Sequence, residues 1–220
     1  MIITIDGPSG SGKSTVAKDL AQRLGFNYCD SGAMYRVVAY GLQSKRIDPH
    51  NTLELGKFLS HPPFRFIFGK NRPMQILINN QPVGEEIRTA EIATMASEVA
   101  TIPEIRNFIN RLQKEYGQLN DVIFEGRGLG SETFPEADFK FFLTSDINTR
   151  AIRRLKELKN VAISLEDVIA DLKIRDHRDA VRDLEPLVIP EGALIIDASS
   201  LTVSQVIDTI VARINEKTAA

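Results

Sequence analysis

The stretch Ile2-Ile3-Thr4-Ile5-Asp6-Gly7-Pro8-Ser9-Gly10-Ser11-Gly12-Lys13-Ser14 decides the fold class of this 220-residue chain. An apolar run leads into a glycine, four free positions and then Gly-Lys-Ser. The glycines let the backbone make turns that a Cβ atom would block, so that successive N–H groups can face a bound phosphate. Residues 15–21 predict a helix, whose N-terminus adds partial positive charge at the same place. This order of strand, loop and helix predicts that the chain binds a nucleoside triphosphate.

Within the loop, the side chains predict separate roles. Lys13 places a cation against the β- and γ-phosphate oxygens, and the hydroxyl of Ser14 can bind the Mg²⁺ ion that bridges them. We therefore expect Mg²⁺ to accompany the nucleotide, with Ser14 as its ligand. The expected nucleotide-binding residues are Gly7, Pro8, Ser9, Gly10, Ser11, Gly12, Lys13, Ser14 and Thr15.

Composition predicts a soluble, cytoplasmic protein. A net charge of −2 gives no case for a nucleic-acid or membrane surface, and no apolar run approaches a membrane-spanning length. Cys29 is the only cysteine, which excludes a disulfide framework, and we interpret it as a small buried residue rather than a nucleophile. The chain starts at once with a core strand, which leaves no room for a signal peptide. No obvious apolar face is left exposed, so we expect a monomer.

Apolar runs alternate with helical periodicity along most of the chain. This pattern predicts a parallel sheet with helices on both faces, the three-layer α/β core of a P-loop NTPase. The strands are expected at residues 2–5, 26–30, 122–124, 140–143 and 193–196. The helices are expected at residues 14–24, 33–44 and 203–214, with helical periodicity over 85–116 that breaks near Pro103.

Two segments depart from this alternation. Residues 51–81 suggest short strands at 64–68 and 75–78 around a Gly-Lys-Asn turn, and we interpret the patch as an insertion. Residues 148–182 are highly charged and carry arginines at 150, 153, 154, 175, 178 and 182. Either they form a solvated helical face or they form a lid that grips phosphates, and we favour the lid because phosphoryl transfer needs arginines around its charged oxygens.

Two further segments follow predicted strands and are expected beside the phosphate loop, because ligands sit beyond the carboxyl ends of parallel strands. They are Asp30-Ser31-Gly32-Ala33-Met34-Tyr35-Arg36 and Glu125-Gly126-Arg127-Gly128-Leu129-Gly130. The first offers hydroxyls and a guanidinium for a second ligand. The alternative is that Ser31 merely caps a helix and Arg36 lies on the surface.

With these motifs the chain resembles the bacterial cytidylate kinase family, nucleoside monophosphate kinases of the P-loop class. The likeness runs nearly end to end, through residues 3–10, 30–36, 86–89, 96–100 and 186–188. It implies transfer of the γ-phosphoryl group of ATP to CMP or dCMP. It also implies three parts: a P-loop core at 1–35, 104–147 and 185–220, an enlarged monophosphate-binding domain at 36–103, and a helical lid at 148–184.

The resemblance also implies roles for particular residues. The monophosphate nucleotide is expected to contact Ser31, Arg36, Ser97, Arg106 and Arg127, and the lid residues Arg175, Asp179 and Arg182 are expected to close on it. Lys13, Arg127, Arg175 and Arg182 are the expected catalytic residues. Several arginines suit the chemistry because two anionic nucleotides must meet, and guanidinium forks match phosphoryl oxygens. Asp179 either accepts ribose hydroxyl hydrogen bonds or orients its neighbours. Because phosphoryl transfer relies on positioning and electrostatics, no dedicated general base is expected.

Two positions depart from the family pattern. Gly128 stands where members usually carry an aspartate, similar in role to a group that accepts from the cytosine amino group. Its loss predicts either a weaker preference for CMP over UMP, by about 1–3 kcal/mol, or weaker catalysis than in a relative that carries the aspartate. Glu125 stands where an aspartate is common, and either carboxylate can hold a Mg²⁺-bound water.

Other functions remain open from the sequence. The chain could be a nucleoside monophosphate kinase with relaxed UMP/CMP choice, or a small-molecule kinase of similar architecture acting on another monophosphate or a hydroxyl acceptor. It could also be a nucleotide-dependent regulator that has lost catalysis, an idea that rests on Gly128 alone. Lys13, Ser14 and the lid arginines argue against the regulator.

Overall fold

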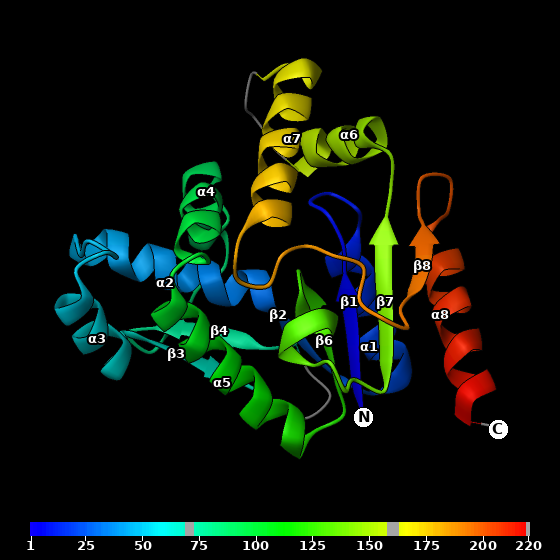
Figure 1. The fold of residues 1–220 in the computed structure, drawn as a ribbon, viewed down its shortest axis with the longest axis horizontal. Coiled ribbons are helices and arrows are strands. Elements are labelled where there is room, and N and C mark those ends of the chain that lie inside the picture. Colours follow the sequence, from blue (N-terminus) through cyan, green and yellow to red (C-terminus); the bar gives the residue numbers. More distant parts are fainter. Residues whose placement is uncertain (69–72, 158–162, 219–220) are drawn as a thin grey trace.

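The computed structural model describes residues 1–68, 73–157 and 163–218 and contains a parallel sheet between two layers of helices (Figure 1). In the described part of the chain the sheet has five strands in the order β2-β6-β1-β7-β8. These are β1 (Ile2–Asp6), β2 (Asn27–Asp30), β6 (Val122–Gly126), β7 (Phe139–Thr144) and β8 (Leu194–Asp197). Helices cover both faces, which explains why the central strands are continuous apolar runs. The fold class predicted from the sequence is confirmed.

Two hydrophobic clusters hold the layers together. On one face, α1 (Lys13–Leu24) and α8 (Val203–Thr218) pack against side chains of β1 and β7. On the other face, α2 (Ser31–Lys45) and α5 (Pro103–Leu119) pack against β6. Pro103 occupies the first turn of α5, where a missing N–H is harmless, and this is why the predicted helical stretch breaks there. Cys29 is fully buried in the second cluster, as expected.

The insertion contains a second, antiparallel sheet made of β3 (Phe64–Ile67), β4 (Gln75–Ile78) and β5 (Gln81–Pro82). Its two predicted strands are present, but the predicted Gly-Lys-Asn turn lies outside the described residues. The sequence interpretation missed the helix α3 (Thr52–Ser60), which precedes them. Asn51 caps this helix by accepting from the N–H of Glu54, and Leu55 and Phe58 bury its apolar face. A local cap and two anchoring side chains therefore form a helix in a part of the insertion for which no element was expected.

The remaining helices surround the edge of the sheet where the strands end. They are η1 (Glu85–Ile87), α4 (Ala90–Val99), η2 (Leu129–Thr133), α6 (Ile147–Glu157) and α7 (Leu165–Val181). The charged segment expected to form a lid contains α6 and α7, with residues 158–162 outside the described part. These helices pack together through Ala151, Val168 and Leu172 and lie beyond the carboxyl ends of β1 and β7 (Figure 1). None of the described helices is long and apolar enough to cross a membrane.

Candidate active site

The phosphate loop connects β1 to α1 and turns through three glycines with positive φ. Gly7, Gly10 and Gly12 have φ values of 150°, 76° and 95°. A Cβ atom on Gly7 would lie 2.0 Å from the carbonyl oxygen of Leu143 on β7. The glycines are therefore required by the loop conformation, as the spacing predicted.

Lys13 is buried at the start of α1, and its Nζ donates a hydrogen bond to the carbonyl oxygen of Pro8 at 2.8 Å. Burial, followed by the nearby Arg127 cation, lowers the pKa of Lys13 to about 8. An ammonium group that is both desolvated and close to another cation is stabilised by an incoming anion. The site is therefore ready for a negatively charged ligand.

Ser14 and Glu125 form the pair of oxygens best suited to a divalent cation. The Ser14 hydroxyl donates to Oε1 of Glu125 at 2.7 Å, across the gap between α1 and the end of β6. Burial raises the pKa of the Glu125 carboxyl group. The described residues contain no group of three or more His, Cys, Asp or Glu side chains that could hold a metal by themselves. One hydroxyl and one carboxylate match the usual Mg²⁺ site, in which nucleotide phosphates and waters supply the other ligands.

A pocket next to the phosphate loop gathers most of the residues expected to bind the monophosphate. Its walls come from α2, α4, α7 and the end of β6, and its volume is about 60 Å³. The expected residues that line it are Ser31, Arg36, Ser97, Arg127, Arg175, Asp179 and Arg182. The hydroxyl of Ser97 is buried and makes no hydrogen bond with the described residues. Arg106 lies behind this wall, where its Nε donates to the carbonyl oxygen of Ala100 at 3.0 Å.

Arginines gather around one carboxylate in this pocket. Asp179 lies 2.6 Å from Nε of Arg127 and 3.6 Å from Nη1 of Arg182. Burial, together with the Arg127 cation, lowers the pKa of Arg175 to about 10. Arg127 also donates to the hydroxyl of Ser9 in the phosphate loop. Asp179 thus orients its arginine neighbours in this structure.

At the start of α2, Ser31 does not cap the helix and Arg36 does not lie on the open surface, as the alternative interpretation of this segment had it. Asp30, not Ser31, is the N-cap residue, since its carboxylate accepts from the N–H of Ala33 at 2.7 Å. The same carboxylate pairs with Arg36 at 2.9 Å, and Arg36 lines the arginine-rich pocket. The hydroxyl of Ser31 accepts a hydrogen bond from Nε2 of Gln113 at 2.8 Å.

The charged helices α6 and α7 touch the phosphate loop directly. From α6, Nη1 of Arg150 donates to the carbonyl oxygen of Ser9 at 3.1 Å, and Nη1 of Arg153 donates to that of Ser11 at 3.3 Å. From α7, Asp176 pairs with Arg150 at 2.5 Å. The sequence interpretation singled out the arginines of this segment but missed Asp176, because nothing local separates it from the other charged residues around it.

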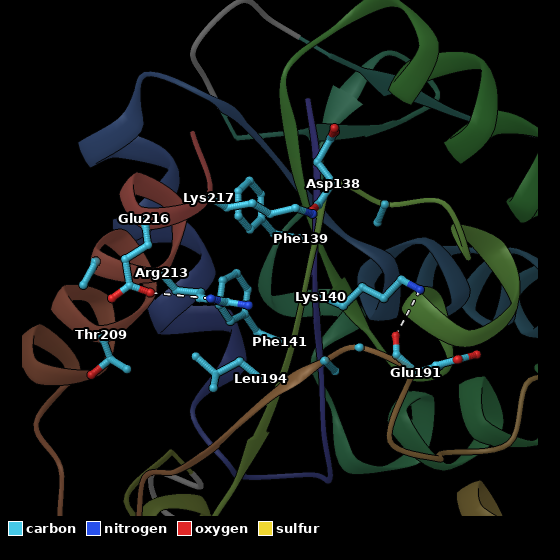
Figure 2. A pocket seen from close by; sticks show the side chains of 14 residues that line it. Asp138, Phe139, Lys140, Phe141, Glu191, Leu194, Thr209, Arg213, Glu216 and Lys217 are labelled. Carbon is cyan, nitrogen blue, oxygen red and sulfur yellow. Dashed lines mark hydrogen bonds and ion pairs between the residues drawn. The ribbon is translucent and has the colours of Figure 1, made fainter. Parts of the chain in front are cut away.

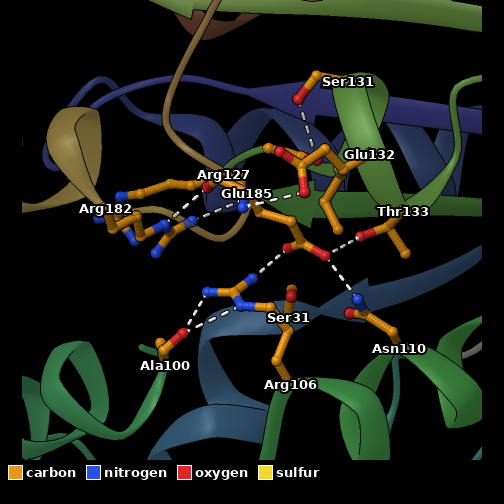
Figure 3. A network of polar contacts seen from close by, with 12 residues as sticks. Ser31, Ala100, Arg106, Asn110, Arg127, Ser131, Glu132, Thr133, Arg182 and Glu185 are labelled. Atoms are coloured by element: carbon orange, nitrogen blue, oxygen red, sulfur yellow. Dashed lines mark hydrogen bonds and ion pairs between the residues drawn. The ribbon is translucent and has the colours of Figure 1, made fainter. Parts of the chain in front are cut away.

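Two more carboxylates were missed. Asp6, at the end of β1, is buried and accepts from the N–H groups of Leu129 and Gly130 at 2.9 and 2.8 Å, which positions η2. Glu185 is buried beside Arg106 in a network of polar contacts (Figure 3). Both residues lie in or next to stretches that resemble the family, but their partners are distant in the sequence, so only the folded arrangement identifies their contacts.

A larger hollow of about 740 Å³ lies at the opposite end of the sheet, at the start of β7 and β8 and against α8 (Figure 2). Figure 2 shows the ion pair between Arg213 and Glu216 and the contact of Lys140 with the Glu191 backbone on its walls. None of the expected site residues lines it. The residues expected to bind nucleotides line the smaller pocket at the phosphate loop instead.

The chain is similar to known proteins over nearly its whole length. A model of the family described as "Cytidylate kinase" matches residues 3–216. A cytidylate kinase of Chlamydia felis is 48% identical over 215 residues, which cover 98% of each chain. One of Chlamydia pneumoniae is 51% identical over 213 residues, 96% of this chain and 97% of that protein. A crystal structure of shikimate kinase from Bacteroides thetaiotaomicron has a TM-score of 0.50 at 13% identity, covers 100% of this chain and 99% of its own, and shows a shared fold alone.

Proposed function

Since this chain belongs to the cytidylate kinase family, we propose that its phosphate loop and arginine-lined pocket transfer the γ-phosphoryl group of ATP to CMP or dCMP. The products are ADP and CDP or dCDP. The chain is a nucleoside monophosphate kinase, a phosphotransferase. The observation that carries the site assignment is the meeting of Lys13 and Arg127 at one rim with the lid arginines Arg175 and Arg182.

ATP binds on the side of the phosphate loop in this proposal. The loop N–H groups and Lys13 hold the β- and γ-phosphates. A hollow of about 250 Å³ adjoins the loop at Gly10, Ser11 and Gly12 and is walled by Arg153 and apolar residues of α8 and the segment before it. It has the apolar lining and the position to take the adenine base, with the guanidinium of Arg153 next to the base plane.

Ser14 and Glu125 would hold Mg²⁺ together with the phosphates. When bound, this ion neutralises the charge that builds up on the β- and γ-oxygens. Ser14 would ligate it directly and Glu125 would orient one of its waters. The 2.7 Å contact between the two side chains supports this proposal, because it brings a hydroxyl and a carboxylate oxygen together beside the phosphate loop.

The monophosphate nucleotide binds in the arginine-lined pocket. Arg36 and Arg127 would hold its phosphate, while Ser97 and Arg106 would contact the base. Arg175 and Arg182 would bridge the two nucleotides, since repulsion between their phosphates must be offset by positive charge. Asp179 keeps these guanidinium groups in place, and it would meet the ribose when the nucleotide enters.

A pocket of about 60 Å³ is too small for a nucleotide, because ligand sites usually measure about 300 Å³ or more. The lid helices must therefore move outward to admit the substrate and return over it. Their return would exclude water and prevent simple hydrolysis of ATP. In this proposal residues 148–184 form the lid, 36–103 the monophosphate-binding domain, and 1–35, 104–147 and 185–220 the core.

ADP release measured with CMP, dCMP, UMP and AMP tests the proposal. We expect fast ADP release with CMP and dCMP and slow release with AMP. The proposal would be overturned if none of the four acceptors raised ADP release above the rate measured with ATP alone. That result would favour a kinase of another small molecule or a regulator without catalysis. Comparable rates with UMP and CMP would instead support a UMP/CMP kinase. The cytoplasmic location and the monomeric state expected from the sequence stay predictions.

A further inference from the structure

Glu185 places a carboxylate behind the base side of the monophosphate pocket. Figure 3 shows it between Arg106, whose Nη1 pairs with its Oε2, and two donors to its Oε1. Those donors are Nδ2 of Asn110 at 2.5 Å and the hydroxyl of Thr133 at 2.9 Å. The residue is 3% exposed, so its charge is largely removed from water. A carboxylate is stable there only with such partners.

The backbone of Glu185 has φ 47°, a left-handed conformation that residues with a side chain rarely adopt. Strain of this kind persists where the surrounding structure requires it and is frequent at functional sites. The N–H of Glu185 is held by the Glu132 carboxylate at 3.0 Å, and its carbonyl oxygen accepts from Nε of Arg182 at 2.7 Å. The structure therefore holds residue 185 in this conformation from both sides.

Gly128 lies directly against Glu185. A Cβ atom on Gly128 would come within 2.9 Å of both Cβ and the carbonyl oxygen of Glu185. Residue 185 thus fills the space in which a side chain at position 128 would begin. Position 128 is where the family resemblance implies an aspartate, and the Cβ atom of any side chain there would require the backbone and Cβ of Glu185 to shift.

We propose that Glu185 is a positioning residue that determines base specificity. It holds Arg106 in the place from which Arg106 contacts cytosine. In this way Glu185 replaces the carboxylate that the family pattern has at position 128. This inference rests on the proposed function. Arg106 contacts two residues of the pocket wall: both its Nε and its Nη2 donate to the carbonyl oxygen of Ala100, and its guanidinium lies 5.5 Å from the centre of the Tyr35 ring.

The contacts of Arg106 with the described residues use three of its five N–H groups. The guanidinium can only donate, so its remaining N–H groups suit an acceptor. Ring nitrogen N3 of cytosine accepts a hydrogen bond, whereas N3 of uracil donates one. An Arg106 fixed by Glu185 therefore favours CMP over UMP without any side chain at position 128.

The Glu185→Gln variant tests this role, because it keeps the size and one acceptor oxygen while removing the charge. We expect the ratio of kcat/KM for CMP to kcat/KM for UMP to fall by about tenfold, the effect of one base contact. The loss should come from a higher KM for CMP, with an unchanged KM for ATP. If Glu185 had a merely structural role, kcat/KM would fall by the same factor for CMP and for UMP, and the ratio would stay constant. Glu191→Gln, an exposed site six positions along the chain, is the matched control and should not change the ratio.

An exchange variant covers the case in which Glu185→Gln does not fold. Gly128→Asp alone should lose activity, because the new side chain meets Glu185 sterically and electrostatically. The double variant Gly128→Asp/Glu185→Ala returns the carboxylate to position 128 and should regain the CMP-to-UMP ratio of the original chain. An unchanged ratio in folded Glu185→Gln, or no recovery in the double variant, would overturn the inference. If the original chain does not phosphorylate CMP, it is the proposed function that fails.

Discussion

Asp176 on α7 accepts a hydrogen bond from the backbone N–H of Ser9 at 3.3 Å, and this contact joins α7, part of the proposed lid, to the phosphate loop. The two residues are 167 positions apart in the sequence. The same carboxylate pairs with Arg150, which in turn donates to the Ser9 carbonyl oxygen. In this arrangement the Asp176 carboxylate accepts a hydrogen bond from an N–H group that the phosphate loop would offer to a nucleotide.

Weakening this contact should strengthen nucleotide binding. With Asp176→Asn, we expect the apparent Kd for CMP to fall by roughly twofold to tenfold, because the closed lid must open before the nucleotide enters. Calorimetric titration of CMP measures the change. Glu166→Gln, an exposed charge change on the same helix, should leave the Kd unaltered. Weaker binding by Asp176→Asn would show instead that this carboxylate helps to hold the closed, loaded state.

Replacing Lys13 should remove most of the catalysis and little of the fold. With Lys13→Ala we expect kcat to fall by about 10²–10³-fold, the usual effect of deleting a preorganised group that stabilises transition-state charge. The unfolding midpoint should change little, since the buried ammonium group is poorly compensated before ATP binds. Lys114→Ala, on the exposed side of α5, is the control. Unchanged activity in Lys13→Ala would contradict the mechanism.

The rate should depend on pH through Lys13. Its pKa is lowered to about 8, so the ammonium form is present below this pH and is lost as the pH rises through it. We therefore expect kcat/KM for ATP, which reports the free enzyme, to decline above about pH 8. Bound phosphates favour the charged form, so kcat at saturating ATP should decline only at higher pH. If kcat/KM for ATP and kcat declined at the same alkaline pH, Lys13 would be excluded as the cause of the decline.

Gly128 and Gly25 offer a matched test of packing. Both have positive φ, 77° and 69°, but a Cβ atom on Gly25 would meet nothing within 4 Å. Gly25→Ala should lower the free energy of unfolding by about 1–2 kcal/mol, the penalty for a left-handed conformation. Gly128→Ala should lower it by a further ~1–3 kcal/mol because its Cβ meets Glu185. Urea unfolding at equilibrium measures both, and equal losses would show that the chain near residue 185 relaxes freely.

Much of the fold followed from local patterns. The β/α alternation predicted the parallel sheet and its covering helices, and the break at Pro103 was located because proline suits only the first turn of a helix. Helix α3 was missed, since the cap at Asn51 and its two buried anchors were outweighed by the strand-like run that follows. In the lid, the sequence indicated the arginines but not which of them clamp the phosphate loop.

The sequence by itself determined the phosphate loop, because fixed spacings of Gly, Lys and Ser set backbone geometry and ligand chemistry within a few residues. It also identified Gly128 as a departure from the family pattern. The tertiary structure alone decided what stands in its place. Glu185 meets Gly128 and Arg106 only after the segment that follows α7 packs beside β6 and α5. Contacts of this kind depend on how distant segments pack, and short-range spacing does not encode them.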